Sequence, residues 1–462
     1  MAHIKITKGL DIPIKGKPQG HKIQPIAANG HYVHPRFIGL DLSSFEDTKF
    51  KILTNVGDIV KIGQPLLENK ALPGVMMVSP AAGIIREIRR GLKRSLKDIS
   101  IETIQPEEFV KYEHLDVGTA TRQQIIDKLK EGGLFPHIRR RPFNLLTNPE
   151  HTPRSIFVKA IESSPFAVPP ELQVAGHENE FQDGLNALAK LTDGTVNLVY
   201  RKDSTCSAFT NALNVQKHTA EGPHPIANQS VHIQAIDPIA GPEDVIWTLN
   251  VHTVISIGHL LMTGKYYINR IISIAGPGIL PDKVGYFSAR EGYSITDLIA
   301  GRLPKGHMRL ISGDVLTGKK VESTDFLGFY HYGFCVVPEN TQREFLHFFR
   351  LGTNKFTASR AYLSGIFNNS QREYDFTTSQ HGEKRAFVTS SPYEKVMPLR
   401  VPTMELVKSV MAEDYDLAET LGLLEVDSED FALPTFVDPS KIEMVDIIKQ
   451  GLRQHAKEVG VQ

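Results

Sequence analysis

Hydrophobic positions change their spacing along the chain, and each change predicts a different kind of structure. Between 36 and 105, short apolar runs alternate with Gly and Pro turns, a pattern typical of short strands. Over 106–260, helical periods alternate with apolar runs, which predicts an α/β layer with a mostly parallel sheet. Short strands around one helix return over 261–330, and helices rich in Leu, Glu and Lys are expected from about Pro398.

These changes predict a multi-domain α/β chain, and its 462 residues exceed what one hydrophobic core normally organises. The expected parts are a carrier-like barrel-sandwich β domain, a Rossmann-like α/β domain, a β-grasp (SLBB-like) domain and a C-terminal helical domain. Their boundaries are expected as follows: an extended N-terminal arm over 1–35, the β domain over 36–105, the α/β domain over 106–260, the β-grasp domain over 261–330, and a connecting segment with the helical domain over 331–462.

Five elements of the α/β domain follow from local patterns. Helices are expected where apolar residues recur at helical spacing, over Thr121–Lys130, with Thr119 or Thr121 as N-cap, and over Glu178–Leu191. Strands are expected at the buried apolar runs Ser155–Ile161, Thr195–Tyr200 and Val231–Ile236. In the β-grasp domain the expected elements are Ile271–Ile274, Ser294–Ile299 and Met308–Ile311.

The stretch from Val245 to Gly264 contains no Asp, Glu, Lys or Arg over about the length that spans a bilayer. Asn250, His252 and His259 interrupt it, and a lone spanning helix would place them in lipid. The apolar residues lie near one face of a helix. We therefore expect a buried helix of a soluble domain and no direct membrane span.

Composition removes several classes of function. Lys and Arg together number 52, as do Asp and Glu, so the chain has no basic field for nucleic acid. Cys206 and Cys335 are its two cysteines, too few for a disulfide framework or for the roughly four thiolates of an iron–sulfur cluster. His21, His31 and His34 lie in the arm without a carboxylate cluster, and His331 and His347 are expected to pack or to lie on the surface. No metal site is expected, and the N-terminus lacks the apolar core of a signal peptide.

The first candidate for chemistry is the pair Gly132-Gly133, which follows a helix and precedes Phe135. Paired glycines let the backbone approach a ligand closely, and their N–H groups can bind an anion. The alternative is a helix C-cap and turn. A dinucleotide fingerprint is excluded, since it requires GxGxxG after a strand and before a helix.

The second candidate follows at once, in His137-Ile138-Arg139-Arg140-Arg141-Pro142-Phe143. Arginines beside Ile138 and Phe143 could hold a flat, polar-headed apolar ring such as a quinone. A solvated basic loop, or one that docks an acidic partner, is the alternative. The tentative quinone-binding set is Gly132, Gly133, Phe135, Ile138, Arg139, Arg141 and Phe143, and no catalytic residue is assigned.

The β domain resembles the lipoyl/biotinyl carrier fold through GDIVKIGQPLLENKALPGV and SPAAGIIREI. In carriers the modified lysine lies at a tight hairpin tip. Here the expected tip is Pro73-Gly74, and Lys70 precedes it on the strand. We therefore expect an unmodified, solvated Lys70 in a structural module.

Taken end to end, the chain resembles the A subunit of the bacterial Na+-translocating NADH:quinone oxidoreductase. The resemblance rests on long motifs in order: ITKGLDIPIKGKP, SPAAGIIREIRRGLKR, GPHPIANQSVHI, IISIAGPGILP, RLISGDVLTGKK, YEKVMPL and LPTFVDPSK. Related subunits carry a flavin loop similar to GRGGAGFPTG, where this chain has KEGGLFPHIR. The cysteines of the relatives' cluster region are absent as well. The resemblance thus implies a redox scaffold that has lost its own flavin and cluster.

For function, the resemblance implies a peripheral subunit on the cytoplasmic side of the bacterial inner membrane. Its partners would be the other subunits of a six-subunit redox complex. They carry electrons from NADH through flavins and iron–sulfur centres to ubiquinone, with Na+ export. This subunit would support the step from ubisemiquinone to ubiquinol. Two alternatives stay open: an independent flavin-dependent NADH dehydrogenase, and a pure scaffold that binds no small molecule.

Overall fold

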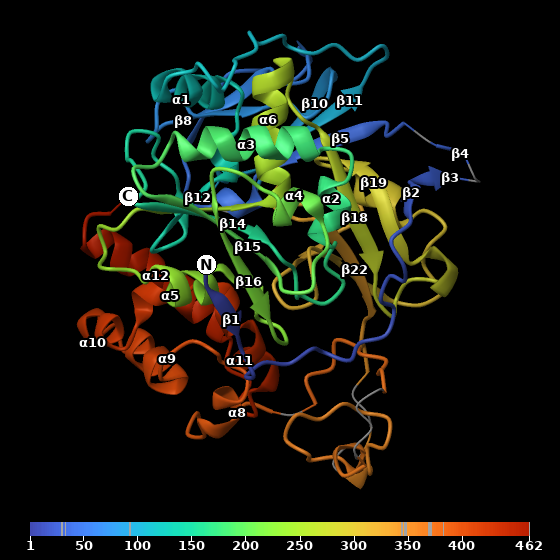
Figure 1. Cartoon of the computed structure of the whole chain (residues 1–462). Coiled ribbons are helices and arrows are strands. Elements are labelled where there is room, and N and C mark those ends of the chain that lie inside the picture. Colours follow the sequence, from blue (N-terminus) through green and yellow to red (C-terminus); the bar gives the residue numbers. More distant parts are fainter. Residues whose placement is uncertain are drawn as a thin grey trace.

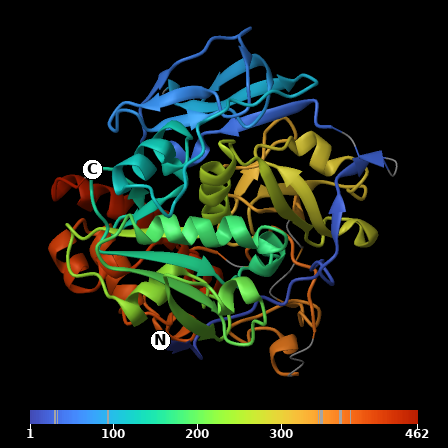
Figure 2. The same ribbon diagram turned by 45° about the horizontal axis from the view of Figure 1, so that its top comes forward.

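The chain folds into a β module, an α/β layer, a β-grasp module and a helical C-terminal region, which pack around one another in this computed structural model (Figures 1 and 2). It describes residues 1–461 except 29, 30, 33, 92, 93, 343, 344, 346–348, 368–371 and 382, so His347 lies outside the described residues. The blue and cyan β module lies at the top of Figure 1, and the red helices lie at the opposite end.

The β module contains two small sheets that enclose an aliphatic core. The four-stranded sheet has the order β5 (Phe37–Asp41), β11 (Leu96–Thr103), β10 (Gly83–Arg90) and β7 (Ile59–Val60). The three-stranded sheet has the order β6 (Phe50–Ile52), β8 (Pro65–Asn69) and β9 (Met76–Val78). The short strands and turns expected here are confirmed. A 3-10 helix, η1 (Ser43–Phe45), follows β5.

A seven-stranded sheet forms the α/β layer. Its order is β1 (His3–Lys5), β16 (Gln216–Glu221), β15 (Thr195–Arg201), β14 (Ser155–Ala160), β17 (Ile246–Asn250), β12 (Arg139–Arg141) and β13 (Leu145–Leu146). The first five are parallel, and β12 pairs antiparallel with both β17 and β13. One face is covered by α1 (Arg122–Glu131), α3 (Glu178–Ala189) and α6 (Val251–Thr263), and the other by α5 (Gln229–Ile236). Short helices α2 (Pro170–Val174) and α4 (Ser207–Thr210) lie between the strands in sequence.

Local signals placed several of these elements correctly. The helix expected from Thr121 begins there with a capping box, in which Thr121 and Gln124 satisfy each other's backbone N–H groups. The strands at Ser155 and Thr195 and the helix at Glu178 are confirmed within a residue or two.

Two expectations in this layer were wrong. The run Val231–Ile236 is not a strand but most of helix α5, because a short apolar run has no period that separates the two. The strand is β16, which lies before this helix in the sequence. Its residues QKHTAE alternate in burial but are mostly polar, so no hydrophobic alternation indicated a strand. The stretch from Val245 is also not one helix. β17 runs into α6 at Asn250, whose side chain accepts a hydrogen bond from the Thr253 N–H at 2.9 Å and so caps the helix.

Helix α6 is buried against α3 and the sheet, as expected for this apolar stretch. Gly264, at φ +65°, ends it. Within the part of the chain that the structure describes, no helix has the length and apolar character to cross a membrane.

The β-grasp sheet has six strands, in the order β2 (Ile23–Pro25), β19 (Gly285–Arg290), β18 (Asn269–Ala275), β22 (Gly333–Pro338), β20 (Met308–Ser312) and β21 (Lys319–Val321). Helix α7 (Ile295–Ile299) is its helical element, preceded by the 3-10 helix η4 (Pro281–Lys283). The N-terminal arm is extended, as expected, but it also adds β1 to the α/β sheet and β2 to this one. Strands β3 (Ala27–Ala28) and β4 (His31–Tyr32) pair with each other.

The C-terminal region is helical, as expected, and packs on the α5 side of the α/β sheet. Its helices are α8 (Ser391–Glu394), α9 (Thr403–Met411), α10 (Tyr415–Thr420), α11 (Ala432–Val437) and α12 (Met444–Glu458), with 3-10 helices η7 (Leu423–Glu425) and η8 (Ser428–Phe431). An irregular segment with one 3-10 helix, η6 (Leu363–Gly365), connects it to β22.

Candidate functional site

The carboxyl ends of the parallel strands are the edge at which α/β proteins bind ligands. In this chain, the N-terminal arm crosses that edge. The Leu10 N–H donates to the His224 carbonyl at 2.8 Å, and the His224 N–H donates to Asp11 Oδ1 at 2.8 Å. Gly9 allows this approach, since a Cβ there would lie 2.2 Å from the His224 oxygen. The loop at Gly222–Ile226 thus follows β16 and is held beneath the arm.

Beside this edge lies a charged cluster, where the α/β sheet meets the C-terminal region. We call it the charged junction and define it as Lys159, Glu162, Arg141, Glu429 and Asp430. Lys159 Nζ lies 2.9 Å from Glu162 Oε1. Arg141 NH1 donates to Ser230 Oγ at 2.9 Å, and Asp430 Oδ1 accepts from Asn228 Nδ2 at 2.8 Å. Strand, helix and 3-10 helix therefore meet through polar groups.

Burial dominates the electrostatics of the junction. It raises the pKa of Glu429 to about 8 although Lys159 and Arg141 oppose the shift, and it also raises the pKa of Asp430. Burial acts to lower the pKa of Lys159, but the carboxylates of Glu162 and Glu429 outweigh it and raise that pKa. The junction is thus a set of mutually compensating charges in which one carboxyl stays protonated near neutral pH.

The two glycines predicted to cradle a ligand lie in close contact with neighbouring elements. Gly132 caps α1 and donates to the Lys128 carbonyl, and Gly133 has φ +68°. A Cβ at Gly132 would lie 2.3 Å from Leu260, and one at Gly133 would lie 2.7 Å from Val78. Side chains of α6 and β9 therefore pack directly against both glycines. The C-cap interpretation fits this geometry.

Phe135 and Ile138 lie in the core on the α6 side of the sheet. The Phe135 ring meets Trp247 edge to face with centroids 6.0 Å apart, and both residues are almost fully buried. Between them His137 Nε2 lies 3.1 Å from Tyr266 Oη, which donates to Glu291 at 2.9 Å. This buried chain fixes the loop to the β-grasp module.

Arg139 and Arg141 point to the opposite face, toward the C-terminal region. Arg139 Nε donates to Asn144 Oδ1 at 3.0 Å, and its guanidinium lies 5.7 Å from the centroid of the Tyr330 ring. Arg141 is 2% exposed, and its Nε and NH2 have no hydrogen-bond partner among the described residues. Of the predicted set, Arg141 belongs to the charged junction, whereas Arg139 contacts Asn144 and Tyr330.

Phe143 lies in a third environment. It adopts φ +71° and packs against His455 of α12, with ring centroids 5.7 Å apart. Ile138 and Phe143, predicted to flank a ring, thus belong to separate hydrophobic cores. The structure brings the arginines near one another, but it separates Phe143 from Phe135 and Ile138. Quinone binding by these seven residues stays a prediction.

Other sequence candidates carry little chemistry in the structure. Lys70 is exposed in the turn after β8. Cys335 is buried and Cys206 is partly exposed, and burial raises the pKa of both thiols, which disfavours a reactive thiolate. The described residues contain no group of three or more His, Cys, Asp or Glu side chains placed to hold a metal ion.

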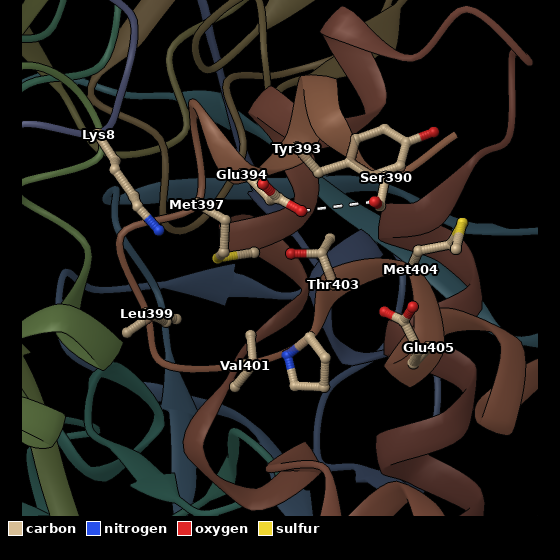
Figure 3. A pocket seen from close by; sticks show the side chains of 11 residues that line it. Lys8, Ser390, Tyr393, Glu394, Met397, Leu399, Val401, Thr403, Met404 and Glu405 are labelled. Carbon is tan, nitrogen blue, oxygen red and sulfur yellow. Dashed lines mark hydrogen bonds between the residues drawn. The ribbon is translucent and has the colours of Figure 1, made fainter. Parts of the chain in front are cut away.

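A pocket of about 310 Å³ lies where the N-terminal arm meets the C-terminal helices, a place the sequence did not indicate (Figure 3). Its lining joins one residue of the arm, Lys8, to the α8–α9 region: Ser390, Tyr393, Glu394, Met397, Leu399, Val401, Pro402, Thr403, Met404 and Glu405. The arm is fixed here by the Gly9 N–H, which donates to the Lys395 carbonyl at 2.9 Å. Only folding brings the two ends of the chain together.

Comparison with known proteins matches the modules in order. Residues 4–104 match the NqrA N-terminal barrel-sandwich hybrid domain, residues 120–266 the NqrA second alpha/beta domain, and residues 271–323 the NQRA C-terminal domain. The chain is 35% identical to the A subunit of the Na(+)-translocating NADH-quinone reductase of Chlamydia pneumoniae, covering 99% of this chain and 98% of that protein. It is 37% identical to the subunit of the same name from Saccharophagus degradans, covering 98% and 100%.

A solved structure, the NAD+-reducing [NiFe]-hydrogenase in its air-oxidized state, is similar over 75% of this chain and 68% of its own, with 10% identity and a TM-score of 0.38. The names of the two relatives define the class of protein as one subunit of an oxidoreductase complex. The chain belongs to the NqrA family, which comprises the A subunits of Na(+)-translocating NADH-quinone reductases.

Proposed function

We propose that this chain supports quinone reduction in a Na+-translocating NADH:ubiquinone reductase, at the step from ubisemiquinone to ubiquinol, and holds no redox cofactor of its own. NADH, flavins and iron–sulfur centres belong to partner subunits, and ubiquinone is the substrate. The chain is a peripheral subunit on the cytoplasmic side of the membrane. Family membership over almost the whole chain carries this proposal.

The glycine loop supports the part of the proposal that concerns the cofactor. Leu260 and Val78 occupy the space beside Gly132 and Gly133, so this loop offers no cradle for a flavin. The chain would therefore act on quinone by binding and positioning it while electrons arrive from elsewhere. Flavin absorption or stoichiometric iron in the purified chain would contradict this assignment.

At residue level, the loop predicted from the sequence offers two donors. Arg141 keeps N–H groups without an acceptor in the described structure, and Arg139 stacks beside Tyr330. Either could donate to a quinone carbonyl or semiquinone oxygen. A charge-assisted hydrogen bond contributes about 1.5–3 kcal/mol, so its loss would weaken binding roughly 10- to 150-fold.

Titration of the full-length chain with a short-chain ubiquinone tests the function. Arg139→Ala, Arg141→Met and Phe143→Leu, each shown to be folded, test the loop. Arg36→Ala, whose side chain is 77% exposed, is the control. Binding by the parent chain supports the quinone role, and its absence favours the scaffold alternative. Unchanged affinity in all three loop variants removes the loop as the site.

A further inference from the structure

We infer that the pocket between the arm and α9 receives the quinone ring. This inference rests on the proposed function and places the ring at a location that the sequence did not indicate. The pocket contains none of the loop residues, so it is the alternative to the arginine loop as the quinone site. Its volume is about 310 Å³, at the lower end of the range of about 300–1,000 Å³ usual for ligand pockets. Such a space suits one compact ring, with any long isoprenoid tail left outside.

The lining of the pocket is mixed, and its apolar part is fixed by packing. Met397 and Leu399 are 2% and 5% exposed, and Tyr393 is fully buried. The Tyr393 hydroxyl donates to Asp438 Oδ1 at 2.7 Å, so the tyrosine contributes its ring and not its polar end. A thioether, an aliphatic chain and an aromatic ring are the surfaces against which a flat ring packs.

Hydrogen-bond donors without partners border the same space. Thr403 is 7% exposed, and no group among the described residues hydrogen-bonds its hydroxyl, which points toward the space between Glu394 and Met397 in Figure 3. Thr403 opens the nine-residue helix α9, whose N-cap is Pro402 and which has no side-chain cap. The first N–H groups of the helix therefore also lack acceptors.

Lys8 adds a positive charge from the arm. Its ammonium group has no ion pair among the described residues and, in Figure 3, extends toward the pocket. A ring carbonyl is an oxygen acceptor without charge, which matches these donors. An uncharged ring is also not repelled by the two carboxylates at the rim, Glu394 and Glu405, whereas an anionic ligand would be. Glu394 already accepts from Ser390 Oγ at 3.4 Å, and both carboxylates could accept from the O–H groups of a reduced ring.

The test is a calorimetric titration of the full-length chain with a short-chain benzoquinone and, separately, with benzoate. Thr403→Val removes the hydroxyl at almost constant shape, Lys8→Met removes the charge, and Val401→Trp fills the pocket. Thr435→Val is the matched control, because the Thr435 hydroxyl likewise has no partner among the described residues but lies outside the pocket lining. Lys17→Met controls for charge on the arm.

The expected result is quinone binding that weakens about two- to tenfold in Thr403→Val, a similar amount in Lys8→Met, and beyond measurement in Val401→Trp. Both controls should bind like the parent. Quinone binding that is equal in the parent and all three pocket variants overturns the pocket alone. Absence of quinone binding in the parent overturns the proposed function and the pocket with it. Tighter binding of benzoate than of quinone also overturns the pocket, by showing an anion site.

Discussion

The charged junction and the arm pocket both collect polar groups where distant segments meet, yet they do so in opposite ways. At the junction, charges face one another across packed elements, as in the 2.9 Å pair of Lys159 and Glu162. At the pocket, Lys8 and the Thr403 hydroxyl border open space and meet no partner within the described structure.

This difference separates polar groups that stabilise the fold from polar groups that are available to bind a ligand. Removing one member of a buried pair of opposite charges destabilises the fold, because it leaves the neighbouring charge unpaired. A donor beside an empty volume contributes nothing to the fold and is available to a ligand. Substitution should therefore mainly lower stability at the junction and mainly lower affinity at the pocket. Arg141, whose Nε and NH2 have no acceptor among the described residues, is the one junction residue that is also tested for affinity.

The largest effect is expected at Arg141. Arg141→Met keeps most of the volume but removes the cation beside Asp430 and Glu429, so the free energy of unfolding should fall by about 3–5 kcal/mol. Chemical denaturation of the parent chain and the variant measures this change. Arg36→Ala, at an exposed site, should change stability by less than about 0.5 kcal/mol. Equal stability of the parent and Arg141→Met would show that the junction does not hold the fold.

Next in size is Gly133→Ala, which tests whether the glycine loop is packed or open. Alanine would adopt an unfavourable φ and place its Cβ 2.7 Å from Val78, so we expect a loss of about 2–4 kcal/mol. Gly176→Ala is the matched control: Gly176 has φ +80° with nothing within 4 Å, and the change should cost only about 1–2 kcal/mol. If both variants lose the same stability in denaturation experiments, steric contact between the alanine Cβ and Val78 does not contribute to the loss.

The sequence predicted what local physics determines. The helix at Thr121 carries its own cap, and the strand at Ser155 is an unbroken apolar run, so both could be read without tertiary information. Helix α5 and strand β16 could not, because the buried face of each depends on its partners. For the candidate site, the arginines were placed near one another, but sequence spacing could not show that Ile138 and Phe143 enter separate cores. The pocket gave no local signal because Lys8 and Thr403 come from opposite ends of the chain.

A smaller effect should appear in the pH dependence of stability. Burial raises the pKa of Glu429 from 4.5 to about 8, so the native state holds a proton that the unfolded chain releases. This carboxyl should therefore lower stability progressively as the pH rises from about 5 to about 8. Since Glu429 is partly exposed, we expect the free energy of unfolding to fall by about 1–3 kcal/mol, which is less than the whole pKa shift would give. In Glu429→Gln, denaturation across this pH range should show a flatter profile, and an unchanged slope would contradict the assignment.

The smallest effect is expected at Thr403, and its sign distinguishes the two regions. Thr403→Val should leave the free energy of unfolding unchanged or raise it by up to about 1 kcal/mol. The substitution breaks no hydrogen bond, because the Thr403 hydroxyl has no partner among the described residues. The matched change at the junction is Ser230→Ala, which removes the acceptor of Arg141 NH1 and should cost about 1–3 kcal/mol. Denaturation midpoints of the two variants, measured under one condition, give the comparison directly. A destabilised Thr403→Val would mean that the Thr403 hydroxyl stabilises the fold, so the pocket would not differ from the junction in this respect. If Thr403→Val is as stable as the parent chain but binds quinone more weakly, the Thr403 hydroxyl contributes to ligand affinity and not to stability.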